Sequence, residues 1–274
     1  MKKLTKNTIK ELLKTRNKNS HKGDYGHTIL IAGSPGHMGA AVIAARACLR
    51  SGTGLLTVNV PHSERFILQL SIPEAMIVIR ENIQEDLTIF SAAAIGPGIG
   101  TDKVSKEMVT HILTHFKKPL LLDADALNII AADKRLFNKI PEGTILTPHP
   151  REFDRLFGFH KNDDERINTA IKTAKKHNMV IVLKGHHTLI TFAGETYVNT
   201  TGNAGLAKGG SGDALTGIIT AFLAQGYQPF NAAMQGVYLH GLAADICLKK
   251  QSMESVLITD VIECLGIAFK QIMK

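Results

Sequence analysis

The sequence predicts an α/β fold with a mostly parallel central sheet flanked by helices on both faces. Three observations support this: short apolar runs alternate with helical stretches, glycines follow several of the apolar runs, and no uninterrupted run of about 18 apolar residues occurs. With 274 residues, 44% of them hydrophobic, the chain can bury a large core in one domain. The composition therefore excludes a disordered protein and a membrane-spanning one.

Short apolar runs bounded by turn residues predict the strands, and the longer stretches between them predict the helices. The predicted strands are 28–32, 55–60, 92–95, 119–122, 144–146 and 179–183. The predicted helices are 40–51, 102–115, 126–132, 151–157 and 164–177. The pattern then changes to a hairpin, 187–192 and 195–199, followed by three successive helices from Ser211 to the C-terminus.

The net charge of +8 is concentrated at the N-terminus. Residues 1–22 hold eight Lys and Arg and one acid, which leaves the main body nearly neutral. Residues 1–20 are predicted to be a basic helical arm whose Leu4, Ile9, Leu12 and Leu13 dock on the body or on a neighbouring subunit, before one domain at 21–274. A nucleic-acid-binding arm is the alternative, but the aromatic residues and motifs of such proteins are missing, so no nucleic-acid partner is expected.

The three cysteines, Cys48, Cys247 and Cys264, show no CxxC spacing and are odd in number. A disulfide framework or a zinc knuckle is therefore not expected, and a reducing cytoplasm fits best. The Lys-rich N-terminus lacks the apolar segment of a signal peptide. The sequence predicts a cytoplasmic protein without a membrane partner.

Two glycine clusters follow predicted strands, at the sheet edge where open α/β folds bind ligands. The first, Gly33 to Gly39, has the spacing GxxGxxG and so is not the Rossmann fingerprint. The second is Gly96-Pro97-Gly98-Ile99-Gly100, whose bare backbone can approach a ligand closely. Both could equally be structural turns at the start of a helix.

The third cluster, Gly205 to Asp213, precedes an apolar helix. Glycines at a helix start leave the backbone N–H groups unshielded, and the helix dipole adds positive potential, so the segment predicts an anion site. Asp213 beside a bound phosphate is a candidate general base for a hydroxyl that attacks the phosphate. The alternative is a carboxylate that only caps its helix.

Further polar groups follow other strands. In Thr147-Pro148-His149-Pro150-Arg151-Glu152-Phe153, His149 can contact a substrate and Glu152 can hold magnesium through water, although Glu152 could be only a first-turn helix acid. Asp123 and Asp125 offer carboxylates for a metal or a ribose, with Asp125 equally suited to cap a helix. The segment Lys184-Gly185-His186-His187-Thr188 suits nucleotide phosphates or ribose, although a His-His pair in a hairpin is usually only solvated surface. His111 and His115 lack a third ligand and are expected to be exposed.

Seven segments can be taken together, in order between residue 21 and about residue 250: 21–26, 32–34, 96–100, 123–128, 147–153, 184–185 and 209–213. In this combination they resemble the ADP/ATP-dependent NAD(P)H-hydrate dehydratase family of the ribokinase-like superfamily. The resemblance implies repair of NADHX and NADPHX, the hydrated reduced cofactors, with ADP or ATP as co-substrate and Mg²⁺ as cofactor. ADP is favoured, with phosphate and AMP as products. Because the family's epimerase domain would not fit before residue 21, the chain is expected to act alone on the S epimer.

The resemblance also implies roles for individual residues. Asp213 would be the catalytic base, and Glu152 and Asp125 would contact the metal through water. The implied nucleotide-binding residues are Lys184, Gly185, His186, His187, Thr188, Gly209, Gly210, Ser211 and Gly212. The implied substrate-binding residues are Ala41, Gly98, Gly100, His149 and Asp213.

Two expectations concern alternatives and assembly. A kinase for a small alcohol would keep the fold and Asp213 but release a stable phosphate ester instead of free phosphate. A homo-oligomer, up to a tetramer, is expected because the basic arm and a C-terminal helix with Val261, Leu265 and Phe269 would suit a subunit contact.

Overall fold

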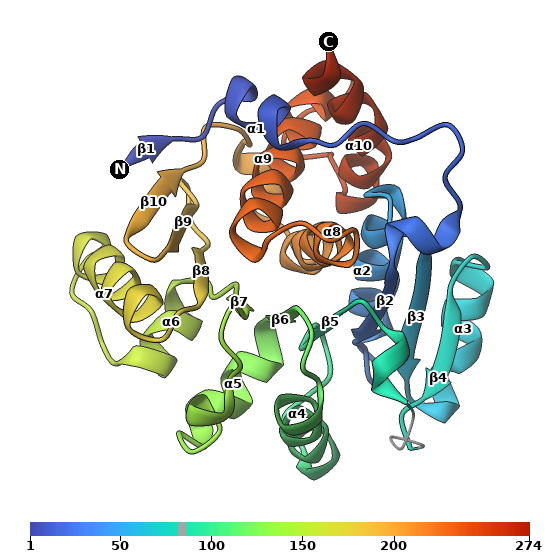
Figure 1. Cartoon of the computed structure of the whole chain (residues 1–274), viewed down its shortest axis with the longest axis vertical. Coiled ribbons are helices and arrows are strands. Elements are labelled where there is room, and N and C mark those ends of the chain that lie inside the picture. The colour runs from blue at the N-terminus through green and yellow to red at the C-terminus, as the bar shows by residue number, and fades with distance from the viewer. Residues whose placement is uncertain (82–85) are drawn as a thin grey trace.

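The computed structural model describes residues 1–81 and 86–274, and within them ten strands form one sheet (Figure 1). The strand order is β1-β10-β9-β8-β7-β6-β5-β2-β3-β4. The strands from β8 to β4 run parallel, whereas β9 is antiparallel to both of its neighbours. The strands are β1 (Lys2–Lys3), β2 (His27–Ile31), β3 (Leu55–Val60), β4 (Met76–Ile79), β5 (Ala92–Ile95), β6 (Leu120–Leu122), β7 (Ile145–Leu146), β8 (Val180–Leu183), β9 (Leu189–Phe192) and β10 (Glu195–Val198).

Helices cover both faces of this sheet, which confirms the predicted fold class (Figure 1). The helices are α1 (Lys6–Leu12), α2 (Met38–Arg50), α3 (Arg65–Ser71), α4 (Lys103–His115), α5 (Ala124–Ala132), α6 (Pro150–Phe157), α7 (Asp163–Lys176), α8 (Ser211–Ala224), α9 (Pro229–Cys247) and α10 (Ile258–Met273). Because side chains alternate along a strand, Ile29 and Ile31 pack toward α4 and α5, whereas Leu30 packs toward α2 and α8. The sheet therefore separates two hydrophobic cores.

Most predicted elements lie within two residues of the observed ones, including the hairpin and the three C-terminal helices. The sequence reading missed β1, α3 and β4. Helix α3 exposes Phe66 and Leu70, so its apolar residues do not mark one buried face. The apolar run that forms β4 is only four residues long and leads directly into the buried Arg80.

The basic arm packs against its own chain. Strand β1 pairs in parallel with β10, and α1 lies against α9 and α10. Leu4 and Ile9 are fully buried in the core, and Leu12 and Leu13 are packed against it. After α1 the chain crosses the α10 side of the molecule to reach β2 (Figure 1). The arm thus contributes a strand and part of one core.

The residues of α10 that were expected to form a subunit contact pack instead inside the chain's own core. Val261 and Leu265 are buried in the chain's own core, where α10 packs against α9 and α2, and Phe269 is half-buried beside them. These side chains contribute to folding and are not available to a neighbouring subunit.

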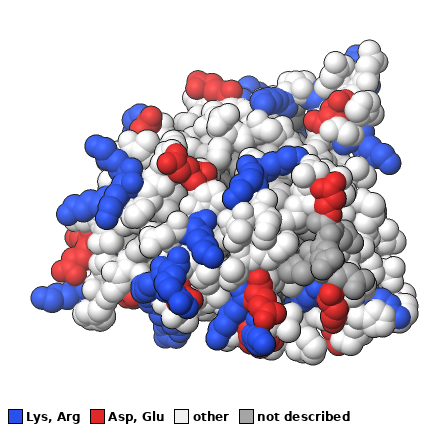
Figure 2. Space-filling model, turned by 60° about the horizontal axis from the view of Figure 1, so that its bottom comes forward, with Lys and Arg blue, Asp and Glu red and all other residues white. Residues whose placement is uncertain are grey.

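The surface and the cysteines agree with the composition. On the face shown in Figure 2, acidic and basic side chains are interspersed, so no continuous basic band forms there. The described part of the chain contains no helix long and apolar enough to cross a bilayer. Its three cysteines are free thiols, although Cys247 Sγ lies 2.8 Å from Cys264 Sγ.

Candidate active site

The glycine-rich turns meet at the carboxyl edge of the parallel strands, beside the point where the strand order reverses between β2 and β5. Gly33 N–H donates to Pro97 O at 2.8 Å, and Ser34 Oγ donates to Gly98 O at 2.8 Å. Gly98 has a positive φ of 62°, and a Cβ there would lie 2.9 Å from Ala40 Cβ. Only glycine fits this close approach of the two turns.

The buried side chain of Arg80 stabilises the Gly33 turn through hydrogen bonds to its backbone carbonyls. Its guanidinium donates to Gly33 O at 2.7 Å and to Ala32 O at 2.9 Å, and burial lowers its pKa to about 10. Sequence reasoning missed this residue because a single arginine after an unrecognised strand carries no motif. Its role follows from the backbone carbonyls that it satisfies.

The first turn of α8 forms the candidate anion site. Gly210 is the N-cap residue, with φ of 92°, and no side chain caps the helix. Ser211 N–H donates to Lys208 O at 3.3 Å, so the N–H groups of Gly212 and Asp213 are the ones left for a ligand, at the positive end of the helix dipole. Gly212 and Asp213 lie in this turn, as the third glycine cluster predicts.

Asp213 has the electrostatics of a general base. Burial raises its pKa to about 6, the charge of Asp123 adds to the effect, and Lys184 opposes it. At neutral pH the carboxyl group is mostly ionised, yet it is a much stronger base than an exposed aspartate. A base with a pKa just below neutral is well placed to accept a proton from an attacking hydroxyl.

Lys184 and Asp123 form the charged centre of the site. Lys184 Nζ donates to Asp123 Oδ1 at 2.8 Å and lies 3.9 Å from Glu152 Oε2. Asp123 is 1% exposed, and its Oδ2 accepts from Thr216 Oγ1 at 2.8 Å. Although burial lowers the pKa of Lys184, the charges of Asp123 and Glu152 raise it more. Asp123 thus joins β6, β8 and α8.

The sequence pointed only in part to this role of Asp123. It marks two acids after a strand, and it favours Asp125 for the metal. In the structure Asp125 Oδ2 accepts from Gly100 N–H at 2.9 Å, so this carboxylate holds the second glycine turn. Asp123, the first acid after the strand, is the one that reaches Lys184.

His149 and Glu152 cap each other at the start of α6. His149 Nδ1 accepts from the N–H of Glu152 at 3.2 Å, and Glu152 Oε2 accepts from the N–H of His149 at 2.8 Å. Burial raises the pKa of Glu152, and burial lowers the pKa of His149. The helix-cap interpretation of Glu152 therefore fits, and the oxygen that caps the helix is also the one 3.9 Å from Lys184 Nζ. The contact of Glu152 with magnesium stays a prediction.

A cavity of about 440 Å³ adjoins this centre. It is lined by several predicted nucleotide residues, namely Lys184, Gly185, His186, Thr188, Ser211 and Gly212. His187 is exposed outside this lining, while Gly209 and Gly210 form the adjacent turn. Ala41 is fully buried beneath Gly33, which leaves its side chain no surface for a ligand.

The cavity wall also contains residues that no sequence motif indicated. Asn199, Thr201, Asn203 and His240 line it. His240 is buried, its Nε2 has no partner among the described residues, and burial lowers its pKa to about 4. Asp245 holds the loop by accepting from Gly202 N–H at 2.9 Å. These residues lie on the loop after β10 and on α9, which only tertiary packing brings together.

This fold and site define a ribokinase-like protein. A solved structure from Enterococcus faecalis that is described as a ribokinase-like superfamily protein has a TM-score of 0.89 and 32% identity, covering 99% of this chain and 96% of that one. The chain belongs to the NAD(P)H-hydrate dehydratase family, whose match spans residues 28–266.

Individual relatives agree with this family. The chain is 40% identical to the ADP-dependent (S)-NAD(P)H-hydrate dehydratase of Neisseria meningitidis, over 86% of this chain and 81% of that protein. An ADP/ATP-dependent NAD(P)H-hydrate dehydratase of Bacillus subtilis, co-crystallised with ATP and Mg²⁺, has a TM-score of 0.90 and 34% identity, covering 99% and 98% of the two chains. The chain also matches bifunctional NAD(P)H-hydrate repair enzymes, of which it spans about half the length.

Proposed function

We propose that the chain uses ADP, or ATP, to dehydrate the S epimer of NADHX and NADPHX to NADH and NADPH, as a metabolite-repair enzyme. The observation that carries this proposal is Asp213, a partly buried carboxylate with a raised pKa in the uncapped first turn of α8, close to Lys184. A proton acceptor, a phosphate cradle and a nucleotide-sized cavity thus occur in one place.

The reaction begins with transfer of the terminal phosphoryl group to the hydroxyl of the hydrated nicotinamide ring. Asp213 accepts the hydroxyl proton as the oxygen attacks phosphorus, and the bond from phosphorus to the bridging oxygen breaks, which releases AMP from ADP. The ring C–O bond then breaks, phosphate leaves, and loss of a ring proton restores the double bond.

Backbone and lysine groups of the site stabilise the phosphoryl group in transfer. The N–H groups at the start of α8, beside Gly209 to Gly212, point at the anion site, and Lys184 supplies a positive charge held in place by Asp123. Fixed donors of this kind stabilise developing negative charge without reorganisation. We assign the nucleotide to the cavity beside Lys184, and the hydrated ring to Gly98, Gly100 and His149.

Magnesium fits this donor set as a nucleotide-bound ion. Within the described residues no three His, Cys, Asp or Glu side chains gather into a metal-binding group. Mg²⁺ commonly keeps several waters and uses only one or two carboxylates together with phosphate oxygens. We propose that Glu152 is the carboxylate that contacts Mg²⁺, through water. Asp125 instead stabilises the Gly100 turn. When bound, the ion neutralises charge on the nucleotide phosphates.

The remaining features are consistent with a cytoplasmic enzyme. Its free thiols suit a reducing compartment. A homo-oligomer stays a prediction, and its contacts would have to use surfaces other than the buried face of α10.

The direct test is to mix the purified chain with NADHX, Mg²⁺ and either ADP or ATP. The near-ultraviolet absorbance of reduced nicotinamide is followed while free phosphate is assayed. We expect absorbance to rise in step with phosphate and the faster nucleotide to be ADP. No change in either signal would contradict the proposal and favour a small-alcohol kinase, whose product is a stable phosphate ester and whose acceptor a substrate screen would have to supply.

A further inference from the structure

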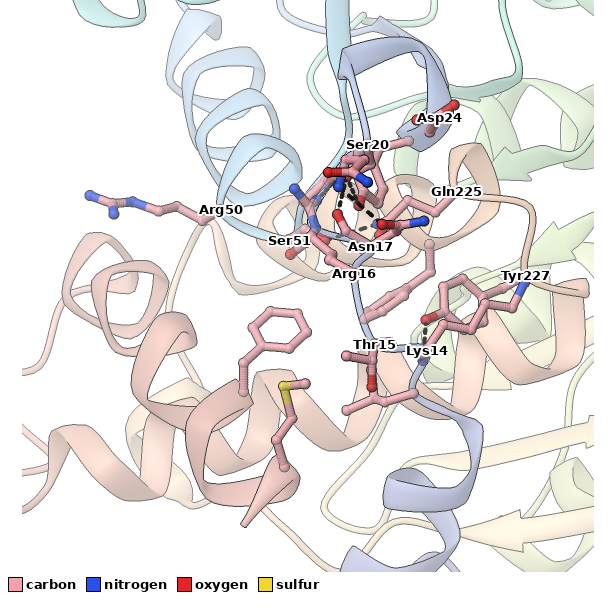
Figure 3. A pocket seen from close by; sticks show the side chains of 17 residues that line it. Lys14, Thr15, Arg16, Asn17, Ser20, Asp24, Arg50, Ser51, Gln225 and Tyr227 are labelled. Atoms are coloured by element: carbon pink, nitrogen blue, oxygen red, sulfur yellow. Dashed lines mark hydrogen bonds between the residues drawn. The ribbon is translucent and has the colours of Figure 1, made fainter.

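A second cavity, of about 910 Å³, lies far from the candidate active site. Helix α8 carries Asp213 in its first turn, and Phe222 near its other end and Gln225 just after it line this second cavity. Its 14 residues separate the two regions by about 20 Å at the usual rise per residue. The other walls are the arm after α1 and the last turns of α2 and α10 (Figure 3).

One side of this cavity is apolar and aromatic. The Phe222 ring lies 5.3 Å from the Tyr227 ring and 6.1 Å from the Phe269 ring, measured between centroids. Leu13 and Met273 complete this side, and Met273 is 52% exposed at its edge. Grouped rings of this kind suit a flat apolar or aromatic body.

The other side carries hydrogen-bond donors and positive charge. The Arg16 guanidinium lies 3.7 Å from the centroid of the Tyr25 ring and donates to Gly52 O, so two contacts fix its position. Ser51 is 2% exposed, and its Oγ has no partner among the described residues. Figure 3 shows Arg16, Ser51 and Gln225 close together, with Lys14 beside Tyr227.

The charges in the lining favour an anion. The lining contains three basic residues, Lys14, Arg16 and Arg50, and one acid, Asp24. Arg50 pairs with Glu263 at 2.5 Å and points away from the other side chains in Figure 3. Lys14 Nζ lies over the Tyr227 ring, 4.7 Å from its centroid, which leaves Arg16 as the cation at the polar end. A fixed guanidinium beside an unsatisfied hydroxyl is an arrangement that binds an anionic head group.

We propose that this cavity binds a small anionic amphiphile, an apolar or aromatic body that carries one sulfonate, carboxylate or phosphate group. The body packs against the partly exposed side chains of Leu13, Phe269 and Met273, over the buried Phe222 ring, and the head group lies at Arg16 beside Ser51. This site is separate from the nucleotide cavity and is independent of the proposed dehydratase reaction.

The experiment titrates the full chain with anilinonaphthalene sulfonate and follows the fluorescence of this aromatic anion. The titration is run without nucleotide and again after addition of saturating ADP and Mg²⁺, which occupy the nucleotide cavity. We expect one binding site per chain that ADP does not displace. Loss of all probe binding on addition of ADP would place the probe in the nucleotide cavity and overturn the proposal.

Paired variants locate the probe. Met273→Glu brings a negative charge to the edge of the cavity and should weaken probe binding about tenfold, while Ile267→Glu, which is 45% exposed on the same helix outside the lining, should not. Arg16→Gln should weaken binding similarly, whereas Arg65→Gln, at another arginine stacked on an aromatic ring, should leave it unchanged. Equal effects within each pair would overturn the assignment.

Discussion

The surroundings of the Asp213 carboxyl group disfavour its ionised form. Burial and the neighbouring Asp123 both raise its pKa, to about 6 from 3.8, and Lys184 counteracts them only in part. Between these two values the folded chain binds more protons at this carboxyl than the unfolded chain, so stability falls as pH rises through that window. Above about pH 6 the full destabilisation is present. The catalytic arrangement thus lowers the stability of the free protein.

The first prediction concerns Asp213→Asn. Loss of the general base should lower turnover by roughly 10²–10⁴-fold with little change in nucleotide affinity. Because the uncharged amide removes the buried negative charge, the melting temperature at pH 8 should rise by about 2–5 °C. Steady-state kinetics and calorimetry measure these effects.

Asp260→Asn, at the corresponding position in the first turn of α10, is the control for turnover. Near-normal turnover in the Asp213 variant would remove this residue from its role.

The second prediction separates Asp123 as a positioning residue from Asp123 as a structural one. In the parent, activity should fall as pH drops through about 6, because Asp213 becomes protonated. In Asp123→Asn the neighbouring charge is absent, so the pKa of Asp213 falls and this acid limb should move to lower pH.

The control for Asp123 is Thr216→Val. It removes the 2.8 Å hydrogen bond to Asp123 but keeps the charge, so the acid limb should stay in place. The pH dependence of kcat/KM measures both variants. An unchanged limb in Asp123→Asn would mean that its carboxylate does not act on Asp213.

At the scale of the elements, turns at the carboxyl sheet edge decide where ligands can approach. The strands were predictable because buried parallel strands are short apolar runs. Helices such as α4 and α7 were predictable because they bury one face, whereas α8 and α9 are long apolar stretches buried almost all round. The glycine clusters were correctly expected to follow strands and precede helices. Segment 65–79 was not predictable, since α3 exposes several apolar residues and β4 is short.

The third prediction is that Gly210→Val weakens nucleotide binding at the start of α8. Gly210 has a φ of 92°, which a β-branched residue adopts only with strain, and a Cβ there would lie 2.6 Å from Ile43 Cδ1. The first turn of α8 should shift, and the dissociation constant for ADP should rise at least about tenfold. Titration calorimetry measures this constant. Gly266→Val, in an open position on α10, is the control and should bind ADP like the parent.

At the scale of the whole molecule, the arm joins parts of the fold that are distant in sequence. Leu4 N–H donates to Val198 O at 2.8 Å, and Thr200 Oγ1 donates to Leu4 O at 2.6 Å. These bonds lie just before the loop that lines the nucleotide cavity. The arm then buries Ile9 between α1 and the C-terminal helices. Its lysines are the exposed side of a structural element.

The fourth prediction follows from this packing. Ile9→Ala removes a fully buried side chain and should lower the free energy of unfolding by about 2–5 kcal/mol. Lys10→Ala, at the adjacent exposed position, should change it by less than about 0.5 kcal/mol. Denaturant unfolding measures both. Equal stability of the two variants would show that the arm does not contribute to the core.

The sequence by itself determined the α/β class and the order of most strands and helices, and it predicts an anion site at the start of α8 with Asp213 as its base. These depend on local patterns: apolar periodicity, glycines that leave backbone N–H groups bare, and an acid in a first helical turn. Tertiary structure decided the rest. It selected Asp123 over Asp125 as the partner of Lys184, brought Arg80 beneath the Gly33 turn, placed His240 in the cavity wall and buried Ala41. These outcomes depend on which strands are neighbours and which way each side chain points, and contacts between residues far apart in the chain leave no local pattern.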